Sequence, residues 1–331
     1  MTELTNNDDH ELKIAVIIPC YKVKQTVVDV ISKIGPEVCS IYVVDDACPD
    51  MTGMYVANKC ATNTRVEVLY HKNNQGVGGA VITGYRAAIS DNHDILVKID
   101  GDGQMNPALI PSFITPIKTG EADYTKGNRF FNIEDVQGMP AARLFGNAAL
   151  SFVSKLSCGY WNVFDPTNGF TAIHAAIAKK LPLDKISKRY FFESDILFRL
   201  NCLRAKVLDI PMVACYGNEK SNMKIRVIIP EFCLKHLTNI VKRIFYNYFL
   251  RNFSIASLEL ILGLAFLTFG ITFGLYEWLQ STITEIPATS GTVMLASLPI
   301  ILGLQFLLAF INYDITHIPS SSLHIYLDKD D

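Results

Sequence analysis

The chain has 331 residues, of which 50% are apolar, and a formal net charge of −2 at pH 7. No nucleic-acid partner is expected for a chain with this near-neutral charge. The length is enough for one domain of roughly 200 residues and a further segment.

Residues 1–11 are polar and are predicted to be a flexible N-terminus. Two buried strands follow, at residues 13–21 (KIAVIIPCY) and 40–50 (SIYVVDDACPD), with a helical pattern between them. A helix over about 53–62 and a strand over 66–70 repeat the alternation. Strands that alternate with helices indicate an α/β fold, in which helices cover both faces of a mostly parallel sheet.

Polar residues end the second strand and begin the helix that follows the third. Asp45 and Asp46 are suited to accept hydrogen bonds from a nucleobase or a ribose, although either could cap the next helix. In residues 73–89 (NNQGVGGAVITGYRAAI), closely spaced glycines let a ligand or a neighbouring strand approach the backbone. Tight helix packing is the equal alternative, because the stretch is neither a dinucleotide-binding fingerprint nor a P-loop.

A short apolar strand within residues 95–107 (ILVKIDGDGQMNP) ends in two carboxylates, Asp100 and Asp102. In an open α/β sheet this edge is where ligands bind. Together with the side-chain oxygen of Gln104, the two acids form an oxygen-only cluster suited to Mg²⁺ or Mn²⁺. An acidic turn that caps the following helix is the alternative interpretation.

Basic side chains follow this acidic strand end. Residues 122–131 (ADYTKGNRFF) are predicted to form a strand that ends in Arg129. Residues 140–161 have the pattern of a helix, on which Arg143 and Asn147 are four residues apart. Because residues at i and i+4 share one face of a helix, this cation and this amide point the same way. Solvation at the surface is the default interpretation for each of them taken separately.

Two C-terminal segments are long and apolar enough to cross a bilayer. Residues 255–279 contain only two charged residues, and residues 292–313 contain none. At ~1.5 Å per residue, helices of this length exceed the ~30 Å hydrocarbon core of a membrane. A long buried hairpin in a soluble protein is the alternative, but no amphipathic pattern remains to face water.

The flanking charges predict an orientation. Residues 214–251 carry seven basic against two acidic residues, whereas residues 280–291 contain no lysine or arginine. By the positive-inside rule, the α/β domain and the C-terminal tail lie in the cytoplasm, and the protein is an integral membrane protein, of the inner membrane if the source is bacterial. The predicted parts are a flexible N-terminus (1–11), an α/β domain (12–215), a basic amphipathic juxtamembrane segment (216–252), a transmembrane helix (253–279), a short external loop (280–291), a second transmembrane helix (292–313) and a cytoplasmic tail (314–331).

The juxtamembrane segment has apolar residues near helical spacing within residues 226–250, with basic residues on other faces. Such a helix can lie in the headgroup layer of a bilayer. An ordinary amphipathic helix packed on the soluble domain or on another subunit is the alternative.

Seven short motifs occur in a characteristic order over roughly residues 12–215: VIIPCY, VVDDACPD, NNQGVGGA, KIDGDGQMNP, KGNRF, DPTNGF and FFESD. As a set they resemble the family 2 glycosyltransferases of the Rossmann-like GT-A fold, within the dolichyl-phosphate mannose synthase and polyprenyl-phosphate glucosyltransferase branch. The two apolar C-terminal segments fit the membrane-anchored members of that branch.

The resemblance implies an inverting, metal-dependent glycosyltransferase. It would transfer one sugar from a nucleotide-diphosphate donor, a UDP- or GDP-sugar, to a polyprenyl phosphate such as undecaprenyl or dolichyl phosphate, for cell-envelope glycan or glycoconjugate synthesis. An enzyme that extends an already glycosylated lipid carrier, or that makes a polysaccharide, is the alternative. A catalytically inactive membrane scaffold would need a broken acidic strand end or missing basic residues.

The resemblance also implies roles for individual residues. Mg²⁺ or Mn²⁺ would be held by Asp100, Asp102 and Gln104, and Asp102 is counted among the catalytic residues. The donor nucleotide pocket would be formed by Pro19, Tyr21, Asp45, Asp46, Asn74, Gln75, Gly76, Gly79 and Asp100. The acceptor phosphate would be bound by Arg129, Arg143 and Asn147, of which the two arginines count as catalytic.

Two expectations remain. Glu193 or Asp195 is expected to position a sugar hydroxyl, although acids in the first turn of a helix often only compensate its dipole. A homo-oligomer such as a tetramer is also expected, because Gly263, Gly270 and Gly274 offer points of close approach between transmembrane helices.

Overall fold

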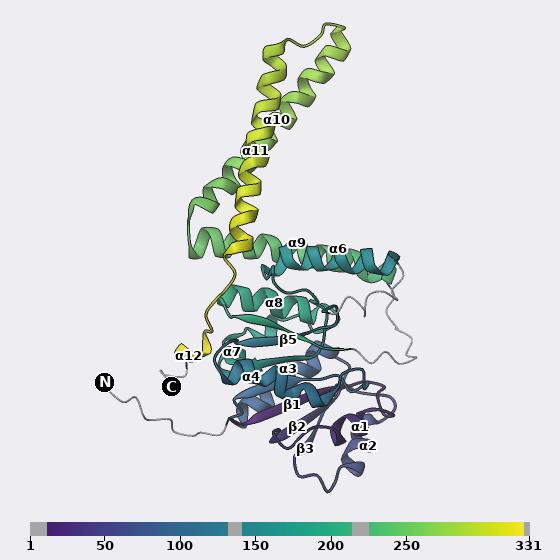
Figure 1. The fold of residues 1–331 in the computed structure, drawn as a ribbon. Helices are drawn as coiled ribbons and strands as arrows, with labels where there is room; N and C mark the ends of the chain where they lie inside the picture. Colours follow the sequence, from purple (N-terminus) through teal and green to yellow (C-terminus); the bar gives the residue numbers. More distant parts are fainter. Residues whose placement is uncertain (1–11, 132–140, 214–224, 328–331) are drawn as a thin grey trace, which may run out of the picture. The chain divides into compact units, whose positions relative to one another are not determined.

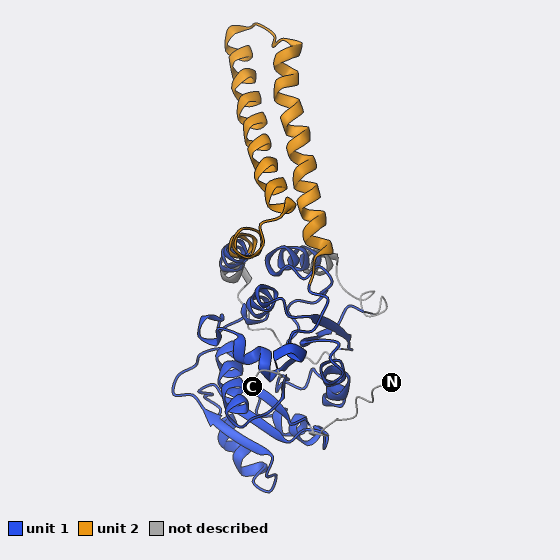
Figure 2. Cartoon of the chain, turned by 90° about the vertical axis from the view of Figure 1, so that its left-hand side faces the viewer, with its two compact units in different colours: residues 1–239, 319–331 blue, residues 240–318 orange. Residues whose placement is uncertain are grey.

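The computed structural model describes residues 12–131, 141–213 and 225–327, except for the side chains of residues 141–145, 147 and 225–228. The predicted flexible N-terminus lies outside the described residues. The chain divides into two compact units (Figure 2), one of residues 1–239 and 319–331 and the other of residues 240–318.

The first unit is built on a seven-stranded sheet with the order β3-β2-β1-β4-β6-β5-β7. Figure 1 labels β1, β2, β3 and β5 of this sheet. Its strands are β1 (Ile14–Cys20), β2 (Ser40–Asp45), β3 (Val66–Tyr70), β4 (Ile95–Lys98), β5 (Tyr124–Asn128), β6 (Thr171–His174) and β7 (Val207–Pro211). Strand β6 runs antiparallel to both of its neighbours, and the other paired strands are parallel. The predicted α/β fold with a mostly parallel sheet is confirmed.

Helices cover both faces of this sheet and explain its continuous apolar strands. The helices of the unit before the juxtamembrane segment are α1 (Val27–Ser32), α2 (Thr52–Lys59), α3 (Val77–Ser90), α4 (Ile110–Lys118), α6 (Ala141–Cys158), α7 (Ala175–Lys180) and α8 (Phe192–Leu203). One hydrophobic core lies between the sheet and helices α3 and α8, and a second lies between the sheet and helices α1 and α4. Strands covered on both faces lose the polar alternation of a half-exposed strand.

The parallel register brings three strand ends together. Cys20 at the end of β1 pairs with Asp45 at the end of β2, and Ile17 of β1 pairs with Lys98 of β4. Asp46 and Asp100 follow directly after β2 and β4. The acidic residues predicted to share one edge of the sheet therefore do so.

The second unit contains two long apolar helices, α10 (Ile255–Thr284) and α11 (Ser290–Thr316), both long enough to cross a membrane. Only 11% of the most apolar window of each helix is buried, which argues against the core hairpin of a soluble protein. They follow α9 (Ile225–Phe245), which starts in the first unit, and a π-helical turn at Tyr246–Arg251.

The glycines of α10 pack against α11 of the same chain. A Cβ atom at Gly263 would lie 2.8 Å from Leu307 Cδ2, and one at Gly270 would lie 2.8 Å from the carbonyl oxygen of Ala296. A Cβ atom at Gly274 would likewise lie 3.3 Å from the Cβ atom of that alanine. These glycines serve the packing of α10 on α11 within one chain, so they no longer support the expected homo-oligomer.

A buried ion pair lies where this helical hairpin begins and ends. Arg243 is 2% exposed, and its Nη1 and Nη2 lie 2.6 and 2.9 Å from Oδ1 and Oδ2 of Asp314. The hydroxyl of Tyr248 donates to the same Oδ1 at 2.6 Å. Arg243, one of the basic residues of the juxtamembrane segment, is therefore an internal residue.

The end of the described chain returns to the first unit. Asp123, 0% exposed, accepts hydrogen bonds from the backbone nitrogens of Leu323 and His324, both at 2.8 Å, and its Oδ1 lies 2.7 Å from His324 Nδ1. The His324 ring stacks on that of His174 with centroids 4.3 Å apart. Helix α12 (His324–Leu327) is thereby fixed to the α/β domain.

Candidate active site

A cavity of about 690 Å³ opens at the carboxyl ends of the central strands. The predicted site residues that line it are Pro19, Tyr21, Asp46, Asn74, Gly76, Asp100, Asp102 and Glu193. The predicted residues that do not line it are Asp45, Gln75, Gly79, Gln104 and Arg129. Arg143 and Asn147 fall on α6, but their side chains lie outside the described residues; Leu150 of the same helix lines the cavity.

Asp46 shapes the wall of the cavity by holding a turn. Its carboxylate, 3% exposed, accepts hydrogen bonds from the backbone nitrogens of Gln75 at 2.7 Å and Gly76 at 2.8 Å. His71 Nδ1 lies 2.7 Å from the same carboxylate, and Asn74 Nδ2 donates to the Asp46 carbonyl at 3.2 Å. The predicted nucleotide-binding residues of this turn are thus joined into one rigid unit.

Asp45 supports the neighbouring loop instead of facing the cavity. Its Oδ1 accepts from the Cys48 nitrogen at 2.7 Å, and its Oδ2 accepts from the Gly53 nitrogen at 2.5 Å. Of the two interpretations of this residue, the structure favours a cap of the loop and of helix α2 over direct contact with a ligand.

The glycine-rich turn is occupied by another part of the same chain. Gly79 donates to the carbonyl of Lys188 at 3.1 Å, and a Cβ atom at Gly78 would lie 2.6 Å from the carbonyl oxygen of Ser187. The close approach that the glycines permit therefore belongs to the segment before α8. That segment carries Arg189 and Tyr190 into the cavity lining, and neither residue belongs to the motifs that predict the site.

Asp100 and Asp102 place two carboxylates on one cavity. The Gln104 nitrogen donates to Asp102 Oδ1 at 3.0 Å, so this residue contributes its backbone to the acidic turn. The buried Oδ1 of Asp100 lies 3.0 Å from the Lys98 ammonium. Mg²⁺ is commonly held by one or two carboxylates together with substrate phosphates, so this oxygen donor set fits a divalent cation.

The described residues contain no group of three histidine, cysteine, aspartate or glutamate side chains that could hold a metal. A cation here would therefore need oxygens from the bound substrate or from water, in addition to the two carboxylates. Substrate phosphates would complete such a site, and water can take their place in the free enzyme.

Lys98 connects this acidic turn to Glu193. Its ammonium lies 3.1 Å from Glu193 Oε1, and the lysine is 1% exposed. Burial acts to lower the pKa of Lys98, but Asp100 and Glu193 together raise it above its usual value. The lysine therefore stays charged. Its position in an otherwise apolar strand, directly before the acidic turn, is the sequence signal that could have identified it.

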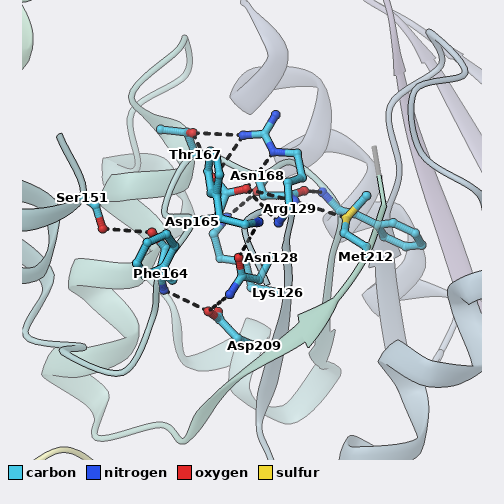
Figure 3. A network of polar contacts seen from close by, with 12 residues as sticks. Lys126, Asn128, Arg129, Ser151, Phe164, Asp165, Thr167, Asn168, Asp209 and Met212 are labelled. Carbon is cyan, nitrogen blue, oxygen red and sulfur yellow. Dashed lines mark hydrogen bonds and ion pairs between the residues drawn. The ribbon is translucent and has the colours of Figure 1, made fainter. Parts of the chain in front are cut away.

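Arg129 is held by a buried acid beside the cavity (Figure 3). Its Nε lies 2.7 Å from Asp165 Oδ2 and its Nη2 lies 3.0 Å from Oδ1. The same Nη2 donates at 3.4 Å to the hydroxyl of Thr167, which lines the cavity. Although burial acts to raise it, the pKa of Asp165 is lowered, mainly by hydrogen bonding and attraction to Arg129.

The family profile described as Glycosyl transferase family 2 matches residues 15–181, half of the chain. The chain belongs to this family. It is a glycosyltransferase with a GT-A-like α/β domain followed by two long apolar helices.

Characterised relatives act on lipid phosphates. The undecaprenyl-phosphate mannosyltransferase of Micrococcus luteus is 30% identical over 204 residues, 61% of this chain and 83% of that protein. The UDP-N-acetylglucosamine–dolichyl-phosphate N-acetylglucosaminyltransferase of Methanococcus voltae is 29% identical over 216 residues, 61% of this chain and 86% of that protein.

A solved structure shows the same fold. Glucosyl-3-phosphoglycerate synthase from Mycobacterium tuberculosis, in complex with Mn²⁺, uridine diphosphate and glucosyl-3-phosphoglycerate, matches 70% of this glycosyltransferase and 80% of its own chain. The TM-score is 0.51 at 18% identity.

Of the two acids at the start of α8, only Glu193 reaches the cavity of the glycosyltransferase. Asp195 is 4% exposed; its Oδ2 accepts from the Ser187 nitrogen at 2.8 Å and its Oδ1 from Asn239 Nδ2 at 3.2 Å. It therefore anchors the segment that carries Arg189, while Glu193 lines the cavity.

Proposed function

We propose that this glycosyltransferase transfers a single sugar, with inversion, from a UDP- or GDP-sugar to a polyprenyl phosphate. One observation carries the proposal: a single cavity has the Asp100 and Asp102 carboxylates, Glu193 and Arg189 in its lining, and the same chain has two helices long enough to cross a membrane. The lipid-phosphate acceptors of the relatives support the same assignment.

The donor occupies the part of the cavity near the Asp46 turn. Pro19, Tyr21 and the turn around Asn74 form the nucleotide wall, and Glu193 accepts a hydrogen bond from a hydroxyl of the sugar. Asp100 and Asp102 hold Mg²⁺ or Mn²⁺, which, when bound, stabilises the negative charge that develops on the diphosphate leaving group.

The acceptor phosphate needs positively charged groups to bind it, and it does not need a general base to activate it. A phosphate monoester has a second pKa around 6, so near neutral pH it is largely dianionic and can attack the anomeric carbon unaided. Two anionic reactants must nevertheless meet, and arginines can bind phosphate through two parallel hydrogen bonds. We assign this role to Arg189 in the cavity, to Arg129 beside it, and to Arg143 and Asn147 of α6.

The exposed and buried faces of α9 support a membrane-bound enzyme. Its exposed apolar residues at helical spacing are Leu234, Leu237, Val241 and Phe245. Its buried polar residues are His236, Asn239 and Arg243. In α9 these apolar side chains face outward and these polar side chains face inward, the opposite of a helix on the surface of a soluble protein. Such a helix is suited to lie with its outer face in the lipid interface. We therefore propose an integral membrane protein with its catalytic domain and its tail in the cytoplasm.

A donor panel tests the function. The full-length protein in detergent is incubated with undecaprenyl phosphate, Mn²⁺ or Mg²⁺, and in turn UDP-glucose, UDP-N-acetylglucosamine, UDP-galactose and GDP-mannose, with glycolipid formation read by mass spectrometry. We expect one donor to give a polyprenyl-phosphate monosaccharide that is lost on addition of EDTA. Transfer only to an already glycosylated lipid diphosphate, supplied in a parallel reaction, would contradict the proposal.

A further inference from the structure

Lys98 is the last residue of β4 and lies between two acids that come from different elements. Its Nζ is 3.0 Å from Asp100 Oδ1, just after β4, and 3.1 Å from Glu193 Oε1, in the first turn of α8. Both acids line the cavity. One buried ammonium therefore joins the carboxylate assigned to the metal to the carboxylate assigned to the sugar.

The surrounding backbone keeps this lysine in place. A Cβ atom at Gly169 would lie 2.5 Å from both Lys98 Nζ and Asp100 Oδ2, so the turn before β6 packs directly on the pair. Strand β4 lies between β1 and β6, where Lys98 pairs with Ile17 on one side and Thr171 on the other. The pairing fixes the backbone of Lys98, and the burial of the side chain, which is 1% exposed, leaves the ammonium little room to move.

Resting on the function proposed above, we propose that Lys98 is a positioning residue that couples metal binding to sugar positioning. By attracting the Asp100 carboxylate, Lys98 competes with any cation for it and so lowers the metal affinity of the donor-free enzyme. Once Asp100 is neutralised by a cation, Lys98 interacts chiefly with Glu193 and orients that carboxylate toward the sugar hydroxyl. Glu193 is thereby set for the donor only when the metal site is filled.

The metal half of the proposal is tested without any donor or acceptor. Mn²⁺ binding to the full-length, nucleotide-free protein is measured from the electron paramagnetic resonance of unbound Mn²⁺. Because a unit charge a few Å away acts strongly in a protein interior, Lys98→Met should bind Mn²⁺ about tenfold more tightly than the wild type. Unchanged or weaker binding would overturn the proposal.

Lys126 supplies the matched control. It is also a fully buried lysine, but its ammonium donates to the carbonyl of Asn168. Lys126→Met should therefore change the Mn²⁺ affinity less than about twofold, because no contact with a metal carboxylate is lost. If Lys98→Met and Lys126→Met increased the Mn²⁺ affinity equally, the cause would be the general loss of a positive charge and not the loss of the contact with Asp100.

A second pair of variants covers the case in which Lys98→Met does not fold, since that change leaves Glu193 without its buried cation. Glu193→Gln is compared with the double variant Lys98→Met/Glu193→Gln, in which both charges of the pair are absent. The double variant should bind Mn²⁺ about tenfold more tightly than Glu193→Gln. Equal affinities of these two variants would refute competition by Lys98.

The sugar half is tested by non-additivity at saturating Mn²⁺. If Lys98 acts on the sugar through Glu193, Lys98→Met and Glu193→Gln each lower kcat, and the double variant loses less than about twofold beyond Glu193→Gln. Fully additive losses would contradict this route. A wild type that transfers no sugar to polyprenyl phosphate would defeat the proposed function, whereas the Mn²⁺ measurements would still decide the role of Lys98.

Discussion

Arg129 and Asp165 form a two-point ion pair in which Nε lies 2.7 Å from Oδ2 and Nη2 lies 3.0 Å from Oδ1. Asp165 is 1% exposed, so its charge depends on this partner. We predict that Arg129→Ala lowers the free energy of unfolding by roughly 3 kcal/mol, because a buried carboxylate is left uncompensated. Thermal unfolding of the detergent-solubilised protein measures the loss, and a variant as stable as the wild type would contradict the structural role.

Arg189 should behave differently because its side chain is exposed in the cavity. We predict that Arg189→Ala leaves the unfolding temperature nearly unchanged and raises KM for the lipid phosphate by about tenfold, the cost of a lost charge-assisted hydrogen bond. Initial rates at varied acceptor concentration measure this. A KM equal to that of the wild type would remove Arg189 from the acceptor site.

Asp102→Asn tests the metal assignment. The change removes one negative charge from the acidic turn and keeps the size of the side chain, so we expect a loss of at least about 100-fold in sugar transfer with folding retained. Asp29→Asn, at an exposed i,i+4 pair with Lys33, is the control and should keep wild-type activity. Turnover by Asp102→Asn near the wild-type rate would refute the role of this carboxylate.

The close packing at Gly78 predicts a steric effect. In Gly78→Ala the new methyl group would meet the carbonyl oxygen of Ser187, which is backbone and cannot rotate away. We expect a loss of about 1–3 kcal/mol in stability, together with reduced activity as the segment bearing Arg189 shifts. Gly291→Ala in α11 is the control, because its nearest atom would be 3.7 Å away. Equal effects of the two changes would argue against the contact.

Asp209 predicts a dependence of stability on pH. Burial raises its pKa from 3.8 to about 6. Because the folded-state pKa is the higher one, the folded state binds the proton more tightly, and the resulting stability is present below about pH 4 and lost as the pH rises through 6. Asp209→Asn should therefore stabilise the protein at pH 7.5, by roughly 1–2 kcal/mol after allowance for solvent screening.

Unfolding temperatures at pH 5 and pH 7.5 measure this effect. The wild type should lose more stability than Asp209→Asn between these two values. Parallel curves for the two proteins would show that the buried carboxylate does not titrate in this range.

Residues at strand ends could be predicted from the sequence. Asp46, Asp100 and Asp102 each follow a continuous apolar run, and the parallel register alone brings such positions to one edge. The lining of the cavity therefore contains most of the residues that the motifs indicated for a metal and a nucleotide. The site roles of these residues stay predictions until they are tested.

Contacts between distant segments could not be predicted. The apolar pattern of β6 is the same in either direction, so its antiparallel course depends on tertiary packing. The glycines near Gly78 allowed either a ligand or a chain segment, and only the fold identified the segment around Ser187. Lys98 is a single charged residue in an apolar strand. Its contact with Glu193 could not be predicted, because the two residues are 95 positions apart in sequence.

The bond between Asp123 and His324 has a topological consequence. The chain departs from the α/β domain after residue 239 and rejoins it at residue 319, so both ends of the α10–α11 hairpin are tied to one body. Because both ends of the hairpin belong to the same unit, a chain that leaves one side of a bilayer must return to that side. The number of bilayer crossings between these ends is therefore even.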